Sequence, residues 1–252
     1  MIRCYIDPDR WSVDRMTLGR EESHHVSRVL RAAVGQPVAV TDGQGREAET
    51  EIAEVNRDEV VLAVQQQRVV PEPATRLTLI QALPREQKLD YVIQKATELG
   101  VRDFYPVVTD HSVARVRPGK EEAKQDRWSK IAINAITQCH SVWLPVIHPV
   151  MRLDECLADL ARAHLLIACS LEPDAIPLPE LLSALPGGAP GSVACLVGPE
   201  GDFSTRELAA ARNAGARMVS LGPLVLRSET ASLYILSVLH YLYVLNGRHP
   251  TP

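Results

Sequence analysis

The second half of the chain alternates apolar segments with helix-like segments, and this alternation restricts the fold more than any other feature of the sequence. Segments 103–108, 163–170 and 192–197 are apolar along nearly their whole length. Strands that are apolar on both faces are typical of a parallel sheet that helices cover on both sides. We therefore predict an α/β fold with a parallel sheet for residues 76–252.

Helices between these strands are predicted from apolar residues at helical spacing and from end signals. In 86–100 the apolar residues form one stripe, and a glycine ends the segment. A charged helix is predicted over 121–139 and a short one near 153–162. Segment 231–245 is apolar but shorter than the roughly 20 residues that span a bilayer. It therefore predicts a buried or interface helix.

Two prolines in 69–75 separate this half from a different amino-terminal part. Proline biases the chain toward extended backbone and cannot continue a helix or a central strand. Before this boundary, short segments rich in strand-forming residues alternate with turn signals such as Asp42-Gly43. The pattern predicts a small β-barrel over residues 1–70.

One helix, 21–31, is predicted to interrupt these strands. Val26, Val29 and Leu30 share its apolar face at helical spacing. Another face carries three polar residues: His24, Arg28 and Arg31.

The cysteines and the first residues of the chain indicate its cellular compartment. The five cysteines are scattered and include no C-x-x-C pair, so the sequence signals neither a disulfide framework nor a zinc site. The amino-terminal segment 1–11 lacks the apolar stretch of a signal peptide. We predict a cytoplasmic protein without a metal. Its net charge of −4 means that any surface for a polyanion must be local.

The stretch LVGPEGDFSTRE, 196–207, is the most unusual strand ending in the chain. Ser204 and Glu207 have the spacing of a capping box, which predicts a helix that starts at Thr205 and stops before Gly215. The stretch lacks the glycine spacing of a dinucleotide fingerprint and the lysine of a P-loop.

The glycines of this stretch allow two interpretations. Gly198 and Gly201 would let a ligand approach the backbone, at the carboxyl end of a strand where open α/β sheets bind ligands. The alternative is a strand-turn-helix connection in which the glycines only satisfy turn geometry. The local pattern supports the two interpretations about equally.

A second loop of similar design, 220–232, follows the next strand. Gly222 and a proline turn the chain, and a short apolar run then leads to Arg227, Ser228 and Glu229. An apolar patch beside an arginine at a helix start suits a ligand with an aromatic ring and a charged reacting centre. In the alternative, Ser228 merely caps the helix and Arg227 pairs with Glu229.

Five segments resemble the RsmE family of the SPOUT superfamily, methyltransferases that modify N3 of uridine in 16S ribosomal RNA. In chain order they are HHVSRVLR, REQKLDYVIQKATELGV, RWSKIAINAITQC, LVGPEGDFSTRE and LGPLVLRSETA. The order and spacing of these segments extend over essentially the whole chain.

The resemblance implies a PUA-like β-barrel that binds RNA at residues 1–70 and a SPOUT methyltransferase domain at residues 76–252. It also implies a C-terminal trefoil knot, which would break the rule that chains do not thread their own loops. Loops of the knot would hold S-adenosyl-L-methionine. The implied partners are 16S rRNA, free or within the small ribosomal subunit, and a second copy of the chain.

The resemblance also implies functional residues. The cofactor-binding residues would be Gly198, Pro199, Glu200, Gly201, Leu221, Gly222, Leu224, Leu226 and Arg227, with Ser170 and Leu171 as further candidates. On the predicted amino-terminal helix, His24, Arg28 and Arg31 would face RNA phosphates, although a polar face can also be simply solvated.

Two positions depart from the family pattern. Asp202 stands where the family usually has glycine, and it adds a charge to a cofactor loop. After Cys139, this chain has His140 and Ser141 where many members have a Gly-Arg pair. An arginine that contacts RNA or a partner subunit would thus be missing.

Arg227 and Glu229 are the candidate catalytic residues. Arg227 could donate to a uracil carbonyl and stabilise the negative charge that develops as N3 loses its proton. Glu229 or Glu200 could accept that proton, or Glu229 could only orient Arg227. The target base must be unpaired, because N3 takes part in base pairing. Four basic residues could add to an RNA track, unless they are merely solvated: Lys120, Lys124, Arg127 and Lys130.

Two rival functions remain open at this point. A nucleotide-dependent oxidoreductase or transferase would use the α/β half, but the dinucleotide fingerprint is missing. A non-catalytic RNA-binding protein with a decayed cofactor site would fit the departures at Asp202 and after Cys139.

Overall fold

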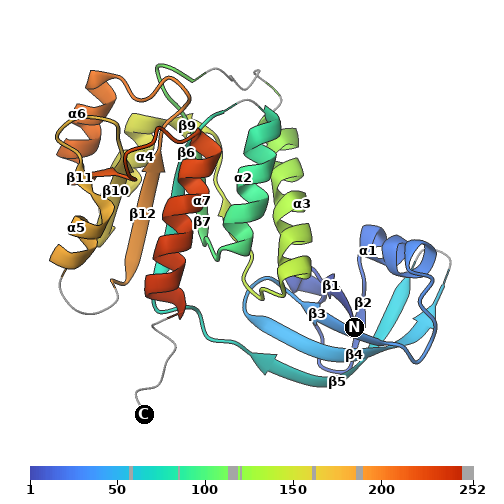
Figure 1. Ribbon diagram of the computed structural model, residues 1–252. Coiled ribbons are helices and arrows are strands. Elements are labelled where there is room, and N and C mark those ends of the chain that lie inside the picture. Colours follow the sequence, from blue (N-terminus) through green and yellow to red (C-terminus); the bar gives the residue numbers. More distant parts are fainter. Residues whose placement is uncertain are drawn as a thin grey trace, which may run out of the picture. The chain divides into compact units, whose positions relative to one another are not determined.

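The chain divides into two compact units (Figure 1). The first comprises residues 1–72 and 133–144, and the second comprises residues 73–132 and 145–252. The structure is a computed structural model, and it describes residues 1–56, 59–84, 86–112, 119, 121–160, 163–185 and 190–245.

The first unit is built on a five-stranded sheet with the order β1-β3-β4-β5-β2. Its strands are β1 (Ile2–Tyr5), β2 (Arg15–Thr17), β3 (Pro37–Thr41), β4 (Arg46–Val55) and β5 (Val60–Val69). β1 runs parallel to β3, and the other pairs are antiparallel. A short 3-10 helix, η1 (Pro8–Arg10), follows β1. The core includes Ile6, Met16 and Ile52, none of which is more than 1% exposed. β2 was not predicted, because its three residues are too few to show a pattern.

The helix predicted over 21–31 is shorter and less regular than its sequence suggests. α1 (Arg20–His24) continues as a π-helix, η2 (His25–Val29). Val26 is buried, but Val29 is 60% exposed and Leu30 is 45% exposed. The predicted apolar face is therefore wrong beyond Val26. A π-turn holds more residues than an α-turn, so residues three apart, such as Val26 and Val29, no longer align on one face.

Arg31 also departs from the prediction. It lies beyond the end of η2 and has a left-handed backbone with φ of 52°. The prediction that His24, Arg28 and Arg31 share one helix face is therefore wrong for Arg31. All three side chains are exposed.

The second unit is built on an eight-stranded parallel sheet, which confirms the predicted α/β class. The order is β11-β13-β10-β12-β6-β7-β8, and β9 also pairs with β7. The strands are β6 (Arg76–Ala82), β7 (Asp103–Val108), β8 (Val146–Ile147), β9 (Met151–Arg152), β10 (Leu165–Cys169), β11 (Ile176–Pro177), β12 (Ser192–Val197) and β13 (Arg217–Ser220).

Helices cover both faces of this sheet (Figure 1). α2 (Glu86–Glu98) and α7 (Ser228–Leu239) pack side by side on one face, and α7 continues as η3 (His240–Leu245). α4 (Leu153–Asp159) and α6 (Thr205–Asn213) pack on the other face, where Ala194 and Leu196 of β12 contact them. The remaining helices are α3 (Glu121–Cys139) and α5 (Leu178–Ala184). Burial on both faces explains why β12 is apolar at every position after its first.

The sequence predictions for two helices are confirmed. α3 has the predicted bounds, and α6 starts at Thr205 with both hydrogen bonds of the capping box between Ser204 and Glu207. α3 ends beside His140, whose φ of 62° is left-handed. This backbone is one that glycine adopts easily, in agreement with the glycine that the resemblance implies at this position.

The cysteines of the molecule are all free thiols. Burial raises the pKa of Cys156 and of Cys169 to about 12. Among the residues that the structure describes, no helix is long and apolar enough to cross a membrane.

Candidate cofactor and catalytic site

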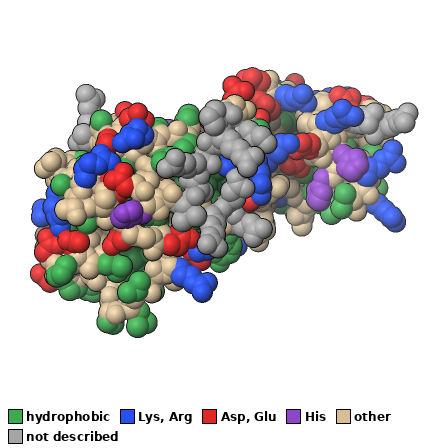
Figure 2. Space-filling model, turned by 90° about the horizontal axis from the view of Figure 1, so that it is seen from above, with side chains coloured by type: hydrophobic (Ala, Val, Ile, Leu, Met, Phe, Trp, Pro, Cys, Tyr) green, Lys and Arg blue, Asp and Glu red, His purple; other side chains and the backbone are tan. Residues whose placement is uncertain are grey.

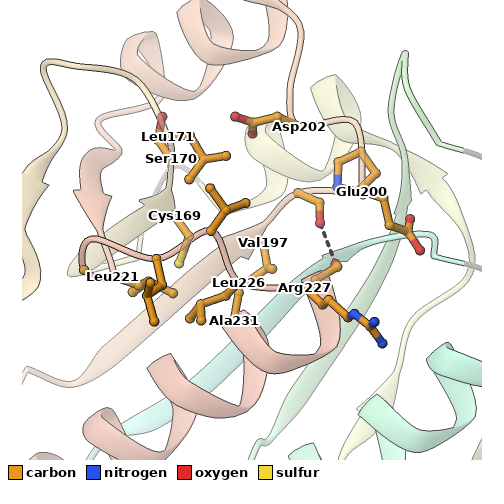
Figure 3. A pocket seen from close by; sticks show the side chains of 16 residues that line it. Cys169, Ser170, Leu171, Val197, Glu200, Asp202, Leu221, Leu226, Arg227 and Ala231 are labelled. Atoms are coloured by element: carbon orange, nitrogen blue, oxygen red, sulfur yellow. Dashed lines mark hydrogen bonds between the residues drawn. The ribbon is translucent and has the colours of Figure 1, made fainter.

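Three segments at the carboxyl ends of β10, β12 and β13 line one pocket of about 250 Å³ (Figure 3). We call residues 198–202 the first pocket loop and residues 221–227 the second pocket loop. The lining contains ten of the eleven residues predicted to bind the cofactor: Ser170, Leu171, Gly198, Pro199, Glu200, Leu221, Gly222, Leu224, Leu226 and Arg227. Gly201 does not line the pocket. The lining also contains six residues outside that prediction: Cys169, Val197, Asp202, Val225, Ser228 and Ala231.

The second pocket loop forms an apolar wall that the protein itself leaves uncovered. Leu224 is 73% exposed and Val225 is 78% exposed, and Leu171 of the neighbouring segment is 58% exposed. Large apolar side chains that gather beside a pocket and remain exposed indicate a ligand surface. Gly222 turns this loop with φ of 133°, a conformation that other residues rarely adopt. The wall therefore suits a planar apolar group.

The first pocket loop is a tight turn. The Asp202 N–H donates to the Pro199 carbonyl over 3.1 Å, and Asp202 has a left-handed φ of 57°. Its Oδ1 accepts the N–H of Phe203 at 2.8 Å. Glycine, which the resemblance implies at this position, adopts a left-handed backbone easily, and aspartate is among the few other residues that tolerate this conformation.

Ser228 ties the two loops together. Its Oγ donates to the Gly198 carbonyl over 2.6 Å (Figure 3). The same Oγ accepts from Nε2 of the buried Gln81 at 2.9 Å. The N-cap of α7 is Arg227, and no side chain caps the helix. The alternative that Ser228 is only a cap is therefore wrong.

Arg227 lies at the start of α7 with an exposed side chain that lines the pocket. Within the described residues its guanidinium has no hydrogen-bond or ion-pair partner. In Figure 3 it points away from the apolar side chains of Leu221 and Leu226, toward the same side as Glu200. The guanidinium is therefore available to a ligand at the mouth of the pocket.

Glu229 pairs with Lys88 and not with Arg227, so the alternative of an Arg227–Glu229 pair is wrong. Glu229 Oε2 is buried and lies 3.2 Å from Lys88 Nζ, an ion-pair distance at which the angles do not form a hydrogen bond. The same Nζ donates to Glu200 Oε1 over 3.0 Å. These contacts raise the pKa of Lys88, with the Glu200 hydrogen bond as the largest cause.

His111 holds the first pocket loop from the other side. Its Nδ1 lies 3.0 Å from the Gly201 carbonyl oxygen and 2.9 Å from that of Asp202. Because both partners are acceptors, Nδ1 must carry the proton. Sequence reasoning assigned no role to Lys88 or His111, since neither lies near the pocket loops in the sequence.

The three candidate RNA-binding residues lie in the first unit. His24, Arg28 and Arg31 are all exposed, and Figure 2 shows histidine and basic side chains gathered over α1 and η2. On α3, the Arg127 guanidinium pairs with Asp90 of α2. Lys120 lies outside the described residues.

The two units match two family models that define a class of protein. Residues 71–240 match the RNA methyltransferase domain, and residues 18–65 match the RNA methyltransferase PUA domain. The chain is thus an RNA methyltransferase with a PUA domain. The chain is 30% identical over 249 residues to ribosomal RNA small subunit methyltransferase E of Bacillus subtilis, covering 96% of each chain. It belongs to this family, RsmE, as the resemblance indicated.

Solved structures confirm the predicted fold of both units. A protein from Legionella pneumophila, solved with the cofactor SAM bound, matches with a TM-score of 0.86 and 29% identity, over 95% of this chain and 97% of that one. Ribosomal RNA small subunit methyltransferase E from Neisseria gonorrhoeae matches in fold with a TM-score of 0.85 and 24% identity, over 96% and 98% of the two chains. The trefoil knot stays a prediction.

Proposed function

We propose that this protein transfers a methyl group from S-adenosyl-L-methionine to N3 of a specific uridine in 16S rRNA. The name of the Bacillus subtilis relative, which matches over nearly the full chain, supports ribosomal RNA of the small subunit as the substrate. The bound SAM of the Legionella pneumophila protein supports the cofactor. The observation that carries the proposal is the pocket itself, in which an uncovered apolar wall lies beside Arg227, whose side chain has no partner among the described residues.

The residues of the pocket fit this cofactor. Leu224, Val225 and Leu171 offer apolar surface for the adenine ring. Across the pocket, Glu200 supplies a carboxylate near its mouth. When bound, S-adenosyl-L-methionine supplies an electrophilic methyl group on its sulfonium, so the protein need only position the reactants and help N3 lose its proton.

Arg227 has the central chemical role in this proposal. Its guanidinium donates to a uracil carbonyl and stabilises the negative charge that grows as N3 loses its proton. Glu200 and Glu229 are the nearby carboxylates that can accept this proton. Both carboxylates contact the Lys88 ammonium.

Arg227→Ala tests this role. We expect methyl transfer to fall by at least 100-fold, the typical loss for one preorganised donor, while affinity for S-adenosyl-L-methionine changes by less than about fivefold. Isothermal titration gives the affinity, and methyl incorporation into unmodified small-subunit RNA or particles gives the activity. Arg212→Ala is the matched control, because Arg212 forms a surface ion pair with Asp174 away from the pocket lining. Equal losses of transfer and affinity would show that Arg227 only binds.

The same titrations separate the rival functions. Wild-type protein is titrated with S-adenosyl-L-methionine and with NAD. Cofactor binding without methylation of RNA or particles would favour a non-catalytic RNA-binding protein. Failure to bind S-adenosyl-L-methionine would overturn the proposal as a whole.

We further propose that the enzyme is a cytoplasmic homodimer that contacts rRNA phosphates through His24, Arg28 and Arg31. Exposed aromatic and apolar side chains on α7 and η3 support a partner surface: Tyr234, Tyr241 and Leu245. The exposure of the three basic residues supports their role, because phosphate contacts require accessible cations. Arg28→Ala should weaken RNA binding uniformly across sequences and reduce its salt dependence.

A further inference from the structure

We infer that Lys88 is a positioning residue that couples the two pocket loops, an inference that rests on the proposed function. Lys88 lies in the first turn of α2, on the sheet face that α2 shares with α7. Its Nζ contacts Glu200 of the first pocket loop and Glu229, which lies two residues beyond the second pocket loop. One ammonium therefore joins residues from three elements that are distant in the sequence.

Burial makes these contacts stronger than an ordinary surface ion pair. The Lys88 and Glu200 side chains are about one-third exposed, and the Glu229 side chain is 16% exposed. The buried Glu229 Oε2 has no hydrogen-bond donor within the described residues. The Lys88 ammonium thus compensates the negative charge of this oxygen. A buried carboxylate without a cation beside it would destabilise the folded protein.

The geometry also brings two like charges together. Glu200 Oε1 and Glu229 Oε2 contact the same nitrogen, so they lie no farther apart than the sum of the two contact distances. Two carboxylates this close repel each other unless a cation lies between them. Without Lys88, Glu229 would keep no cation partner among the described residues, and its charge would push the start of α7 away from the first pocket loop. Arg227, which immediately precedes α7, would move with it.

Lys88 therefore acts through the carboxylates on the shape of the pocket. Its hydrogen bond to Glu200 directs Nζ at the first pocket loop. Ser228 provides the other link between the loops, at the backbone of Gly198. Lys88 acts instead at the side chains of Glu200, which lines the pocket, and of Glu229.

Lys88→Met tests the inference, because methionine keeps much of the side-chain length and removes the charge. We expect at least a tenfold loss of affinity for S-adenosyl-L-methionine by isothermal titration. Lys88→Arg is expected to restore affinity to within about threefold of wild type. Lys95→Met is the matched control: Lys95 lies on the same helix, has a similar exposure of 32%, and pairs only within α2 with Glu98. It should change affinity by less than twofold.

A second measurement needs no cofactor. Glu229→Gln should lower the thermal midpoint of the ligand-free wild type, because it removes the ion pair with Lys88. The same substitution should raise the midpoint of Lys88→Met, because it removes the repulsion between Glu200 and Glu229. A residue that only supports the fold would not produce this reversal of sign.

The outcomes separate the inference from the proposed function. If Lys88→Met binds S-adenosyl-L-methionine within twofold of wild type, or if Glu229→Gln lowers both midpoints, the coupling role is overturned. If the wild type fails to bind S-adenosyl-L-methionine, the proposed function fails instead. The reversal of sign in the ligand-free protein then still decides whether Lys88 couples the loops.

Discussion

The two pocket loops face each other but are held in different ways. Three side chains fix the first pocket loop from separate elements: Lys88, His111 and Ser228. Among the described residues, the hydrogen bonds of the second pocket loop are local: Gly222 bonds Ser220 Oγ, and the Arg227 carbonyl accepts the N–H of Ala231. The first loop is thus shaped by the protein before any ligand arrives, whereas the second leaves apolar side chains for a ligand to cover.

The difference extends to the glycines of the two loops. A Cβ on Gly201 would lie 3.2 Å from the Cβ of His111, so close packing favours glycine there. A Cβ on Gly222 would meet nothing within 4 Å, yet the φ of 133° disfavours other residues. The neighbouring His111 requires glycine at position 201, whereas the backbone angle requires it at position 222. Preorganisation of the first loop reduces the ordering that binding must accomplish.

The largest effect is expected where the two loops meet. Ser228→Ala leaves the Gly198 carbonyl without its donor and Gln81 Nε2 with one acceptor fewer, which should lower the free energy of unfolding by about 2–3 kcal/mol. Urea unfolding measures this change in the free energy of unfolding. The matched control is Ser237→Ala on the same helix, since the exposed Ser237 Oγ bonds only the Leu233 carbonyl; its effect should stay within about 0.5 kcal/mol. Similar losses in both variants would remove Ser228 as the link between the loops.

A smaller effect is expected in the second pocket loop. Gly222→Ala forces alanine toward a disfavoured backbone, with a cost of about 1–2 kcal/mol. Because this loop has few contacts, it can relax, and we expect the cost to appear mainly in the affinity for S-adenosyl-L-methionine rather than in unfolding. Isothermal titration and urea unfolding compare the two. A loss confined to the free energy of unfolding would mean that this loop is as firmly held as the first.

The smallest effect is expected at Asp202. Asn tolerates the left-handed backbone, and its side-chain oxygen can accept the Phe203 N–H, so Asp202→Asn should change the free energy of unfolding by less than about 0.5 kcal/mol. Asp202→Leu is the contrasting variant, because leucine lacks both properties, and it should destabilise by about 1–2 kcal/mol. If Asn is as harmful as Leu, the charge of Asp202 matters to the loop and its backbone role is secondary.

Features encoded by neighbouring residues could be predicted from the sequence. The capping box of α6 depends on Ser204 and Glu207, three residues apart, and both of its hydrogen bonds form. The pocket lining followed from two short motifs at strand ends, because parallel strands bring their carboxyl ends to one edge. The role of Asp202 could not be predicted, because it depends on a left-handed backbone that the sequence does not reveal.

Features that depend on distant residues could not be predicted in this way. Lys88 and Glu200 are far apart in sequence, and a charged residue on a helix has no pattern that reveals its partner. His111 is similar, because its partners are backbone carbonyl groups, which carry no sequence signal. The π-helix at His25–Val29 was not predicted either, because the helix prediction relied on the spacing of an α-helix.

The strand order of the second unit has a consequence for how the chain folds during synthesis. β6 pairs with β7 on one side and with β12 on the other. β7 leaves the ribosome soon after β6, but β12 is completed only at residue 197. At roughly 5–20 residues per second, an apolar central strand therefore waits for seconds with one edge open. Such an edge can pair with another nascent chain, so added chaperone should increase the soluble yield of the recombinant protein.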